Sequence, residues 1–280
     1  MEPLRILKIS RPRFWIYELG TFFLGALSVI PTFGELTRYD ILLFALFFLF
    51  PANVLIYGIN DIFDYETDKN NPKKNEYEAL VHPREHKALY AWILMLTIPF
   101  LVLMFWLPLP QMLSFLSFLF FAVFYSAKPI RAKARPFLDS FFSAGHYVAT
   151  GIFGYYLAGG NTFPWIGVIA GMCWAVAMHA FSAIPDIKMD KEAGLHTIAT
   201  RLGKYQTMLL CSALYIVSAL MFYFVIGWYA LVGGLVYSIV MYRAYTAKSH
   251  YSLFQTYTYF PWINTVIPMI YAVMYMYQRM

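Results

Sequence analysis

The chain has 280 residues, of which 60% are hydrophobic and only 13% carry a charge. A soluble domain of this length has about 25% charged residues, so the composition excludes an ordinary soluble protein and favours a membrane protein. The formal net charge of +6 alone would suit nucleic acid, but its placement follows membrane topology, and we expect no nucleic-acid partner.

Long apolar runs recur along the whole chain. About 20 apolar residues in a helix cross about 30 Å of hydrocarbon. We therefore predict an all-α integral membrane bundle of about nine transmembrane helices around a central cavity, with residues 1–280 forming a single domain. The predicted spans are 14–33, 40–60, 88–108, 111–127, 137–158, 164–184, 207–225, 228–246 and 257–277.

Positive charges alternate between the connections of these spans. Nearly all of the 21 Lys and Arg fall in the N-terminal segment and in the connections that follow the second, fourth, sixth and eighth spans. Positive residues gather on the cytoplasmic side of membrane proteins. The pattern predicts a cytoplasmic N-terminus in a protein of the cell membrane.

Two groups of acidic residues interrupt the apolar sequence where the second and sixth spans end. They are NDIFDYETD at 60–68 and DIKMDKEAG at 186–194. Spacings of i, i+3, i+7 in the first group and i, i+4, i+8 in the second place residues on one helix face. The residues on these faces are Asp61, Asp64 and Asp68, and Asp186, Asp190 and Gly194.

Carboxylates placed this close repel one another unless a cation joins them. Either group alone could be a solvated loop, but two groups on the same predicted side of the membrane favour a ligand. Carboxylate and amide oxygens suit Mg²⁺, which usually bridges to substrate phosphates. Nearby basic residues are candidates to bind the remaining phosphate oxygens. They are Lys73, Lys74, Arg131, Lys133, Arg201 and Lys204.

The two acidic stretches resemble the motifs NDxxDxxxD and DxxxDxxxG of the UbiA superfamily of intramembrane prenyltransferases. Their order, separation and placement agree, and the resemblance covers nearly the whole chain. It implies a Mg²⁺-dependent enzyme with its active site facing the cytoplasm. In such an enzyme an isoprenyl diphosphate loses its diphosphate, and a hydrophobic acceptor attacks the allylic cation.

The same resemblance assigns roles to individual residues. The implied metal ligands are Asn60, Asp61, Asp64, Asp68, Asp186 and Asp190. The implied catalytic residues are these five aspartates and Tyr125, which stands in YSAKPIRAKARP. In that loop Arg131 and Lys133 would face the diphosphate.

Three further stretches resemble the branch of the superfamily that elongates carotenoids. They are SRPRFWIY at 10–17, YSAKPIRAKARPFLDS at 125–140 and HAFSAIPDIKMDKEAGLHT at 179–197. This likeness implies that dimethylallyl diphosphate is the donor and that the end of lycopene or a related carotenoid is the acceptor. A quinone, a chlorophyll precursor or another lipid is the alternative acceptor.

A membrane transporter or lipid carrier is the alternative from a different class of protein. Transporters place their ion-coupling carboxylates near the middle of the bilayer. Here both acidic groups lie at the ends of predicted spans, which favours the enzyme.

Overall fold

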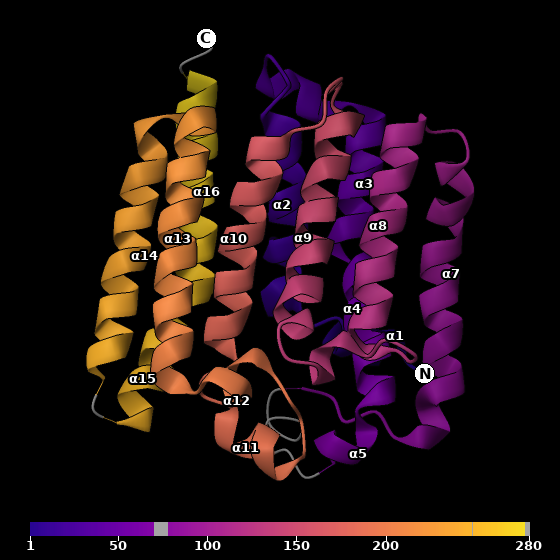
Figure 1. The fold of residues 1–280 in the computed structure, drawn as a ribbon. Coiled ribbons are helices and arrows are strands. Elements are labelled where there is room, and N and C mark those ends of the chain that lie inside the picture. The colour runs from indigo at the N-terminus through magenta and orange to yellow at the C-terminus, as the bar shows by residue number, and fades with distance from the viewer. Residues whose placement is uncertain (70–77, 248, 278–280) are drawn as a thin grey trace. The chain divides into compact units, whose positions relative to one another are not determined.

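A computed structural model of the protein describes residues 1–69, 78–247 and 249–277, and these contain helices and no strand (Figure 1). The all-α prediction is confirmed. Lys73 and Lys74, two of the predicted diphosphate ligands, lie outside the described residues.

Each of the nine predicted spans contains a helix. The long helices are α2 (Trp15–Leu27), α3 (Tyr39–Leu49), α4 (Pro51–Phe63), α7 (His86–Met104), α8 (Leu109–Ser126), α9 (Leu138–Leu157), α10 (Trp165–Ser182), α13 (Lys204–Ile226), α14 (Trp228–Thr246) and α16 (Phe260–Tyr277). The short ones are α1 (Pro3–Ile9), η1 (Pro12–Phe14), η2 (Phe33–Thr37), α5 (Tyr65–Asp68), η3 (Pro83–Glu85), η4 (Ala132–Ala134), α11 (Ile187–Glu192), α12 (Ile198–Leu202) and α15 (His250–Thr258).

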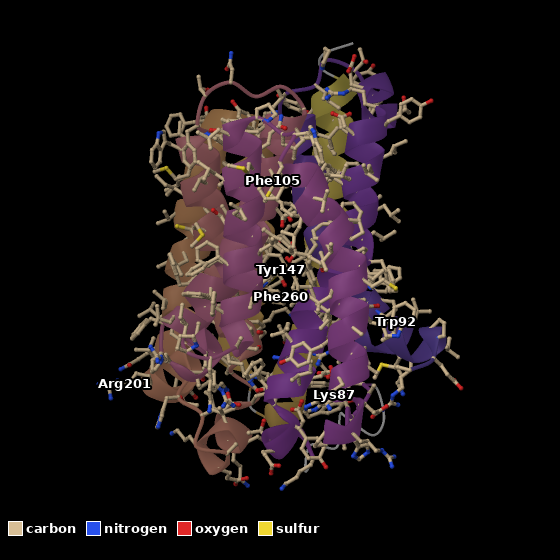
Figure 2. All side chains as sticks on the ribbon, turned by 90° about the vertical axis from the view of Figure 1, so that its right-hand side faces the viewer. Lys87, Trp92, Phe105, Tyr147, Arg201 and Phe260 are labelled. Carbon is tan, nitrogen blue, oxygen red and sulfur yellow. The ribbon has the colours of Figure 1, made fainter. Side chains whose placement is uncertain are left out.

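Five stretches of the described chain are long and apolar enough to cross a membrane. They are Tyr39–Phe63, Pro83–Met104, Leu109–Ser126, Trp165–Ser182 and Lys204–Ile226. On α7, which belongs to the second of these, exposed apolar side chains fill the length between Lys87 and Phe105 (Figure 2). The protein is therefore an integral membrane protein. The count of nine spans, the central cavity and the cytoplasmic N-terminus stay predictions.

The first predicted span, 14–33, is wrong in its extent. Helix α2 has 13 residues and ends at Leu27, which gives it a length of about 20 Å at 1.5 Å per residue. Pro31 has no backbone N–H and disfavours helical geometry at the residue before it. The chain therefore leaves the helix before the predicted end and turns into η2.

The second predicted span, 40–60, consists of two helices. Pro51 begins α4, and Phe50 departs from helical geometry with φ −124°. Proline removes an N–H from the backbone ladder, so carbonyl groups at the end of α3 lose their usual partners. The buried side chain of Asn53 replaces them, because its Nδ2 lies 3.0 Å from the carbonyl oxygens of both Phe48 and Leu49. A polar residue inside an apolar run therefore has a structural role here.

Contacts divide the chain into two compact units. The first unit comprises residues 1–131 and 149–160, and the second comprises 132–148 and 161–280. In the first unit, α4 packs against α3, α7 and α8, and α2 packs against α3 (Figure 1). In the second unit, α13 packs between α10 and α14 (Figure 1). The first acidic motif belongs to the first unit and the second motif to the second.

Buried polar contacts join helices inside each unit. In the first unit, the Thr150 hydroxyl donates to Glu18 Oε2 at 2.7 Å. In the second, Trp174 Nε1 donates to the Tyr237 hydroxyl at 2.9 Å, and that hydroxyl donates to Asn264 Oδ1 at 2.7 Å. Buried polar groups need such partners, because an unpaired group costs about 1–3 kcal/mol.

Glycines let α2 approach the second half of α9 closely. A Cβ on Gly25 would lie 1.9 Å from the carbonyl oxygen of Gly151, and one on Gly154 would lie 2.2 Å from the carbonyl oxygen of Phe22. Both clashes involve backbone atoms that cannot rotate away. Small residues at helix contacts are typical of membrane proteins, where packing replaces the hydrophobic effect.

We expect Gly25→Ala to destabilise the protein by about 1–3 kcal/mol, because α2 must move away from α9 to make room. Gly20→Ala is the matched control, since it lies in the same helix and its Cβ would meet nothing within 4 Å. Alanine favours a helix interior by about 1 kcal/mol over glycine, so this control should keep or raise stability. Thermal unfolding in detergent checks both variants. Equal midpoints would contradict the close packing of α2 and α9.

Candidate active site

The first acidic motif spans the junction of α4 and α5. Asp61 lies in the last turn of α4, Asp64 caps that helix, and Asp68 is the last residue of α5. Asp64 has φ −108° and ψ 3°, which departs from α-helical geometry. The spacing predicted that the aspartates of the motif share one face of a helix, and that prediction is wrong at Asp64, where the helix breaks. Backbone hydrogen bonds from Asp64 N to Asn60 O at 3.0 Å and from Asp68 N to Asp64 O at 2.8 Å nevertheless carry the chain through the junction.

Asp61 is buried against an arginine from the N-terminal segment. The residue is 3% exposed, and Arg11 Nη2 donates to its Oδ1 at 2.8 Å. The buried Glu78 lies 3.1 Å from the same Arg11 nitrogen and 2.6 Å from Arg13. A charge buried without a partner is strongly unfavourable, so the contact with Arg11 offsets part of the cost of burying the Asp61 carboxyl group.

The surroundings of Arg11 favour its charged form. Burial opposes the charge, but the carboxylates of Asp61 and Glu78 outweigh it and raise the pKa of the guanidinium above its ordinary value. The guanidinium also lies over the ring of Tyr57, 4.6 Å from its centre, which adds a cation–π contact. The backbone of Arg11 is in the left-handed region, with φ 50°.

Asp64 and Asn60 contact the end of α8 and the loop that follows it. Arg131 Nη2 lies 3.5 Å from Oδ1 of Asp64, whose residue is 2% exposed. Asn60 Nδ2 donates to the Ser126 hydroxyl at 3.1 Å. Arg131, like Arg11, has a left-handed backbone, with φ 44°. The structure thus brings Arg131 to the first motif, and it places the half-buried Tyr125 directly before Ser126.

The second motif is built on the short helix α11. Asp186 is its N-cap residue, and Asp190 lies one turn later, with Asp190 N donating to Asp186 O at 2.8 Å. Both are half-buried. These two aspartates are one helical turn apart, as predicted. Gly194, which was predicted to lie on the same helix face, instead lies just beyond the end of α11.

Gly194 closes α11 because its backbone has φ +69°. Leu195 N donates to Asp190 O at 2.8 Å and Gly194 N donates to Lys191 O at 3.1 Å. This pair of bonds is the Schellman arrangement, which requires a left-handed residue after the helix. Glycine adopts that conformation without steric cost. The glycine of the sequence motif therefore turns the chain back past Asp190.

Asp139 holds the start of α12, the helix that follows the second motif. It is buried, and its Oδ2 accepts from Ile198 N at 2.9 Å, at the start of α12. Thr197, the N-cap residue of α12, places its hydroxyl 3.5 Å from Asp190 Oδ2. Asp139 therefore acts on the second motif as a positioning residue, through the backbone between α11 and α12.

The remaining predicted phosphate ligands occupy different surroundings. Lys133 is half-buried in η4, and Arg201 is exposed on α12 (Figure 2). Lys204 Nζ donates to the carbonyl oxygen of Ala247 at 3.3 Å, just beyond the end of α14. That bond suits a cation at a helix C-terminus, and the predicted role of Lys204 as a phosphate ligand stays a prediction.

The donor set of the first motif suits a hard divalent cation. Asn60, Asp61 and Asp64 supply amide and carboxylate oxygens at one end of α4, and Asp61 and Asp64 are buried with positive partners. Within residues 1–69, 78–247 and 249–277, no three His, Cys, Asp or Glu side chains gather as a complete metal cage. Mg²⁺ is usually held by one or two carboxylates with substrate phosphates and water, so the residues fit this ion.

Sequence reasoning missed Arg11, Glu78 and Ser126 as parts of the first motif's surroundings. Arg11 lies in the quoted stretch SRPRFWIY and Ser126 lies in YSAKPIRAKARP, so a signal existed. It did not say which carboxylate or amide each residue meets. Arg11 and Asp61 are separated by 50 residues, and only the packed helices show that they touch.

Comparisons with known proteins identify what the chain is similar to. The model of the UbiA prenyltransferase family matches residues 18–276. The lycopene elongase/hydratase of Haloarcula japonica is 37% identical over 95% of this chain and 89% of its own length. The one from Halobacterium salinarum is 34% identical over 94% of both chains. A UbiA homologue from Archaeoglobus fulgidus, solved with DMAPP and Mg²⁺ bound, superposes with a TM-score of 0.74 at 19% identity, covering 97% of this chain and 99% of its own.

We expect Arg11→Gln to lower the free energy of unfolding by about 3–5 kcal/mol, because it removes the positive charge that contacts the buried carboxyl group of Asp61. Arg13→Gln is the control: the Arg13 side chain is 52% exposed, pairs with Glu78 and should cost less than about 1 kcal/mol. Thermal unfolding in detergent measures both. The double variant Arg11→Gln with Asp61→Asn should recover part of the loss. Equal effects of the two single variants would contradict the special position of Arg11.

Proposed function

The chain belongs to the UbiA prenyltransferase family, and from that premise we propose that it transfers a dimethylallyl group from its diphosphate to the end of lycopene or a related carotenoid. The observation that carries the acceptor is the similarity to two lycopene elongase/hydratases, at 37% and 34% identity over nearly the whole chain. Family membership makes the protein a prenyltransferase and rules out the transporter or lipid carrier.

We propose that the two motifs serve the donor diphosphate. Mg²⁺, when bound, supplies positive charge that neutralises the departing diphosphate. The residues proposed to hold it are Asn60, Asp61, Asp64, Asp68, Asp186 and Asp190. Dimethylallyl diphosphate and Mg²⁺ are ligands of the Archaeoglobus homologue. Since the family match covers residues 18–276, we propose that the whole chain acts as a single catalytic domain.

The charges around the first motif support this proposal. Arg11 lies against Asp61 and Arg131 lies against Asp64, so each of these carboxylates has a positive group beside it before any ligand binds. A diphosphate arriving with its metal brings anionic and cationic charge together. The carboxylates can then meet the cation while the arginines meet phosphate oxygens, which guanidinium groups bind with two parallel hydrogen bonds. Buried charges thus stay paired in both states.

The proposed reaction breaks one carbon–oxygen bond and forms one carbon–carbon bond. The bond between the allylic carbon and the diphosphate oxygen breaks, and its electron pair leaves with the diphosphate. A carbon–carbon double bond at the end of the acceptor supplies the pair for the new carbon–carbon bond. The resulting cation loses a proton or takes up water. Arg131 is proposed to bind the leaving diphosphate, and Tyr125 is proposed to lie beside the allylic group.

Neighbouring groups must keep water away from the allylic cation until the acceptor attacks. We propose that α4, the helix that carries Asp61, helps to exclude water, because most of its residues are buried. We propose that the active site faces the cytoplasm in the cell membrane, where both the charged donor and the apolar acceptor can reach it.

We expect membranes that contain the protein to add one or two isoprenyl units to lycopene when supplied with dimethylallyl diphosphate and Mg²⁺. The reaction should stop with EDTA and resume when Mg²⁺ is restored. Chromatography with mass spectrometry of the pigment measures the gain. Folded protein that leaves lycopene unchanged but prenylates a quinone or chlorophyll precursor would overturn the carotenoid acceptor and leave the family assignment in place.

We expect Asp61→Asn and Asp186→Asn each to lower turnover by at least a hundredfold, because each removes a carboxylate proposed to bind the donor's metal. The protein should stay folded in the membrane, since asparagine has nearly the same shape and Arg11 keeps its contact with Glu78 in the Asp61 variant. Glu66→Gln is the control, because Glu66 lies inside the first motif but is exposed and paired with Lys69; its turnover should be unchanged. Near-normal turnover in both aspartate variants would overturn the proposed metal site.

A further inference from the structure

A groove on the second unit lies outside both acidic motifs. It has a volume of about 310 Å³ and is lined by residues of α14, the end of α15 and the start of α16. Its lining includes Val236, Ile239, Val240 and Arg243 from α14, with Tyr259 and Trp262 opposite. Sites for small molecules usually measure about 300–1,000 Å³, so this groove suits part of one extended molecule.

The lining on α14 is one stripe of the helix. The spacing of Val236, Val240 and Arg243 is i, i+4, i+7, which repeats on one face. Over that stripe the wall is apolar and ends in a single positive charge. A ligand that matches it has an extended apolar body and an anionic group at one end.

The side chains that border the groove are of the kind that face lipid. Along α14 the side chains of Leu231, Leu235 and Ile239 are exposed, as is Trp262 at 73%. Exposed apolar side chains in such a row suit hydrocarbon, and Trp and Tyr are enriched where hydrocarbon meets water. The aromatic residues near Arg243 therefore place this end of the groove at the level of lipid headgroups.

Arg243 itself has room for an anion. Its side chain is exposed, and in the described part of the chain it takes part in no salt bridge and no side-chain hydrogen bond. A polyene acceptor carries no charge and would leave the guanidinium without a partner. A phospholipid phosphate would bind it as a bidentate acceptor.

We propose that this groove binds an anionic phospholipid, with its phosphate on Arg243 and one acyl chain along Val236, Val240 and Trp262. Arg243 lies at the end of α14 that is predicted to be cytoplasmic, and the cytoplasmic leaflet is rich in anionic lipids. The site is separate from the reaction and would tie α14, α15 and α16 to the membrane.

The test uses the full-length protein in phosphatidylcholine vesicles that contain a small share of lipid with brominated chains, either phosphatidylglycerol or phosphatidylcholine. Brominated chains quench tryptophan fluorescence on contact. The protein has seven Trp, so the difference between the wild type and Trp262→Phe isolates the signal from Trp262. We expect brominated phosphatidylglycerol to bind about fivefold more tightly than brominated phosphatidylcholine, from the roughly 1 kcal/mol that one arginine gives near an anionic surface.

Variants distinguish the effect of the Arg243 charge on lipid binding from the effect of the groove's shape. Arg243→Gln should reduce the preference to about one, and Arg243→Lys should keep most of it. Lys8→Gln removes the same charge from an exposed residue of α1 and should change nothing. Val236→Phe should weaken the quenching of Trp262, because it fills the groove while Arg243 remains.

Three outcomes would overturn the proposal. Equal quenching by the two lipids in the wild type would mean that the groove meets only bulk lipid. Equal effects of Arg243→Gln and Lys8→Gln would mean that Arg243 does not hold the headgroup. Protection of Trp262 from both lipids would mean that another molecule, such as a second copy of the chain, covers the groove.

Discussion

The burial of two carboxylates at the end of α4 is the constraint on which the candidate active site depends. Asp61 and Asp64 are almost inaccessible to solvent, and each lies beside an arginine from elsewhere in the chain. Charged groups keep their charge inside a protein only when they are paired. The N-terminal segment and the loop after α8 therefore both meet the end of α4 inside the first unit.

The backbone shows that this convergence has a conformational cost. Arg11 and Arg131 both have left-handed backbones, with φ of 50° and 44°. A non-glycine residue in that region costs of order 1–3 kcal/mol, and such residues tend to occur at functional sites. The two arginines with this backbone conformation are the ones that contact the buried carboxylates of Asp61 and Asp64.

Polar residues inside the apolar helices have two different uses. Asn53 restores the hydrogen bonds that Pro51 removes, and Thr150 pairs with Glu18 between α2 and α9. These contacts hold the scaffold together, as does the contact of Ser140 Oγ with His179 Nδ1 at 3.0 Å. The residues of the acidic motifs instead lie at helix ends, with Asp64 at the end of α4 and Asp186 at the start of α11.

The sequence by itself determined the all-α class, the membrane setting, both acidic motifs and the family, because each of these depends on local composition or on residues close together in the chain. It also singled out Arg131 as a diphosphate ligand, through a resemblance in a short loop, and the structure then placed Arg131 beside Asp64. It could not find the break at Asp64, the turn at Gly194 or the partnership of Arg11 with Asp61. Breaks and turns follow from backbone angles that several sequences allow, and the pairing joins residues 50 positions apart. Only the tertiary structure decided these three features, since packing of the helices determines which distant charged residues are buried in contact with each other.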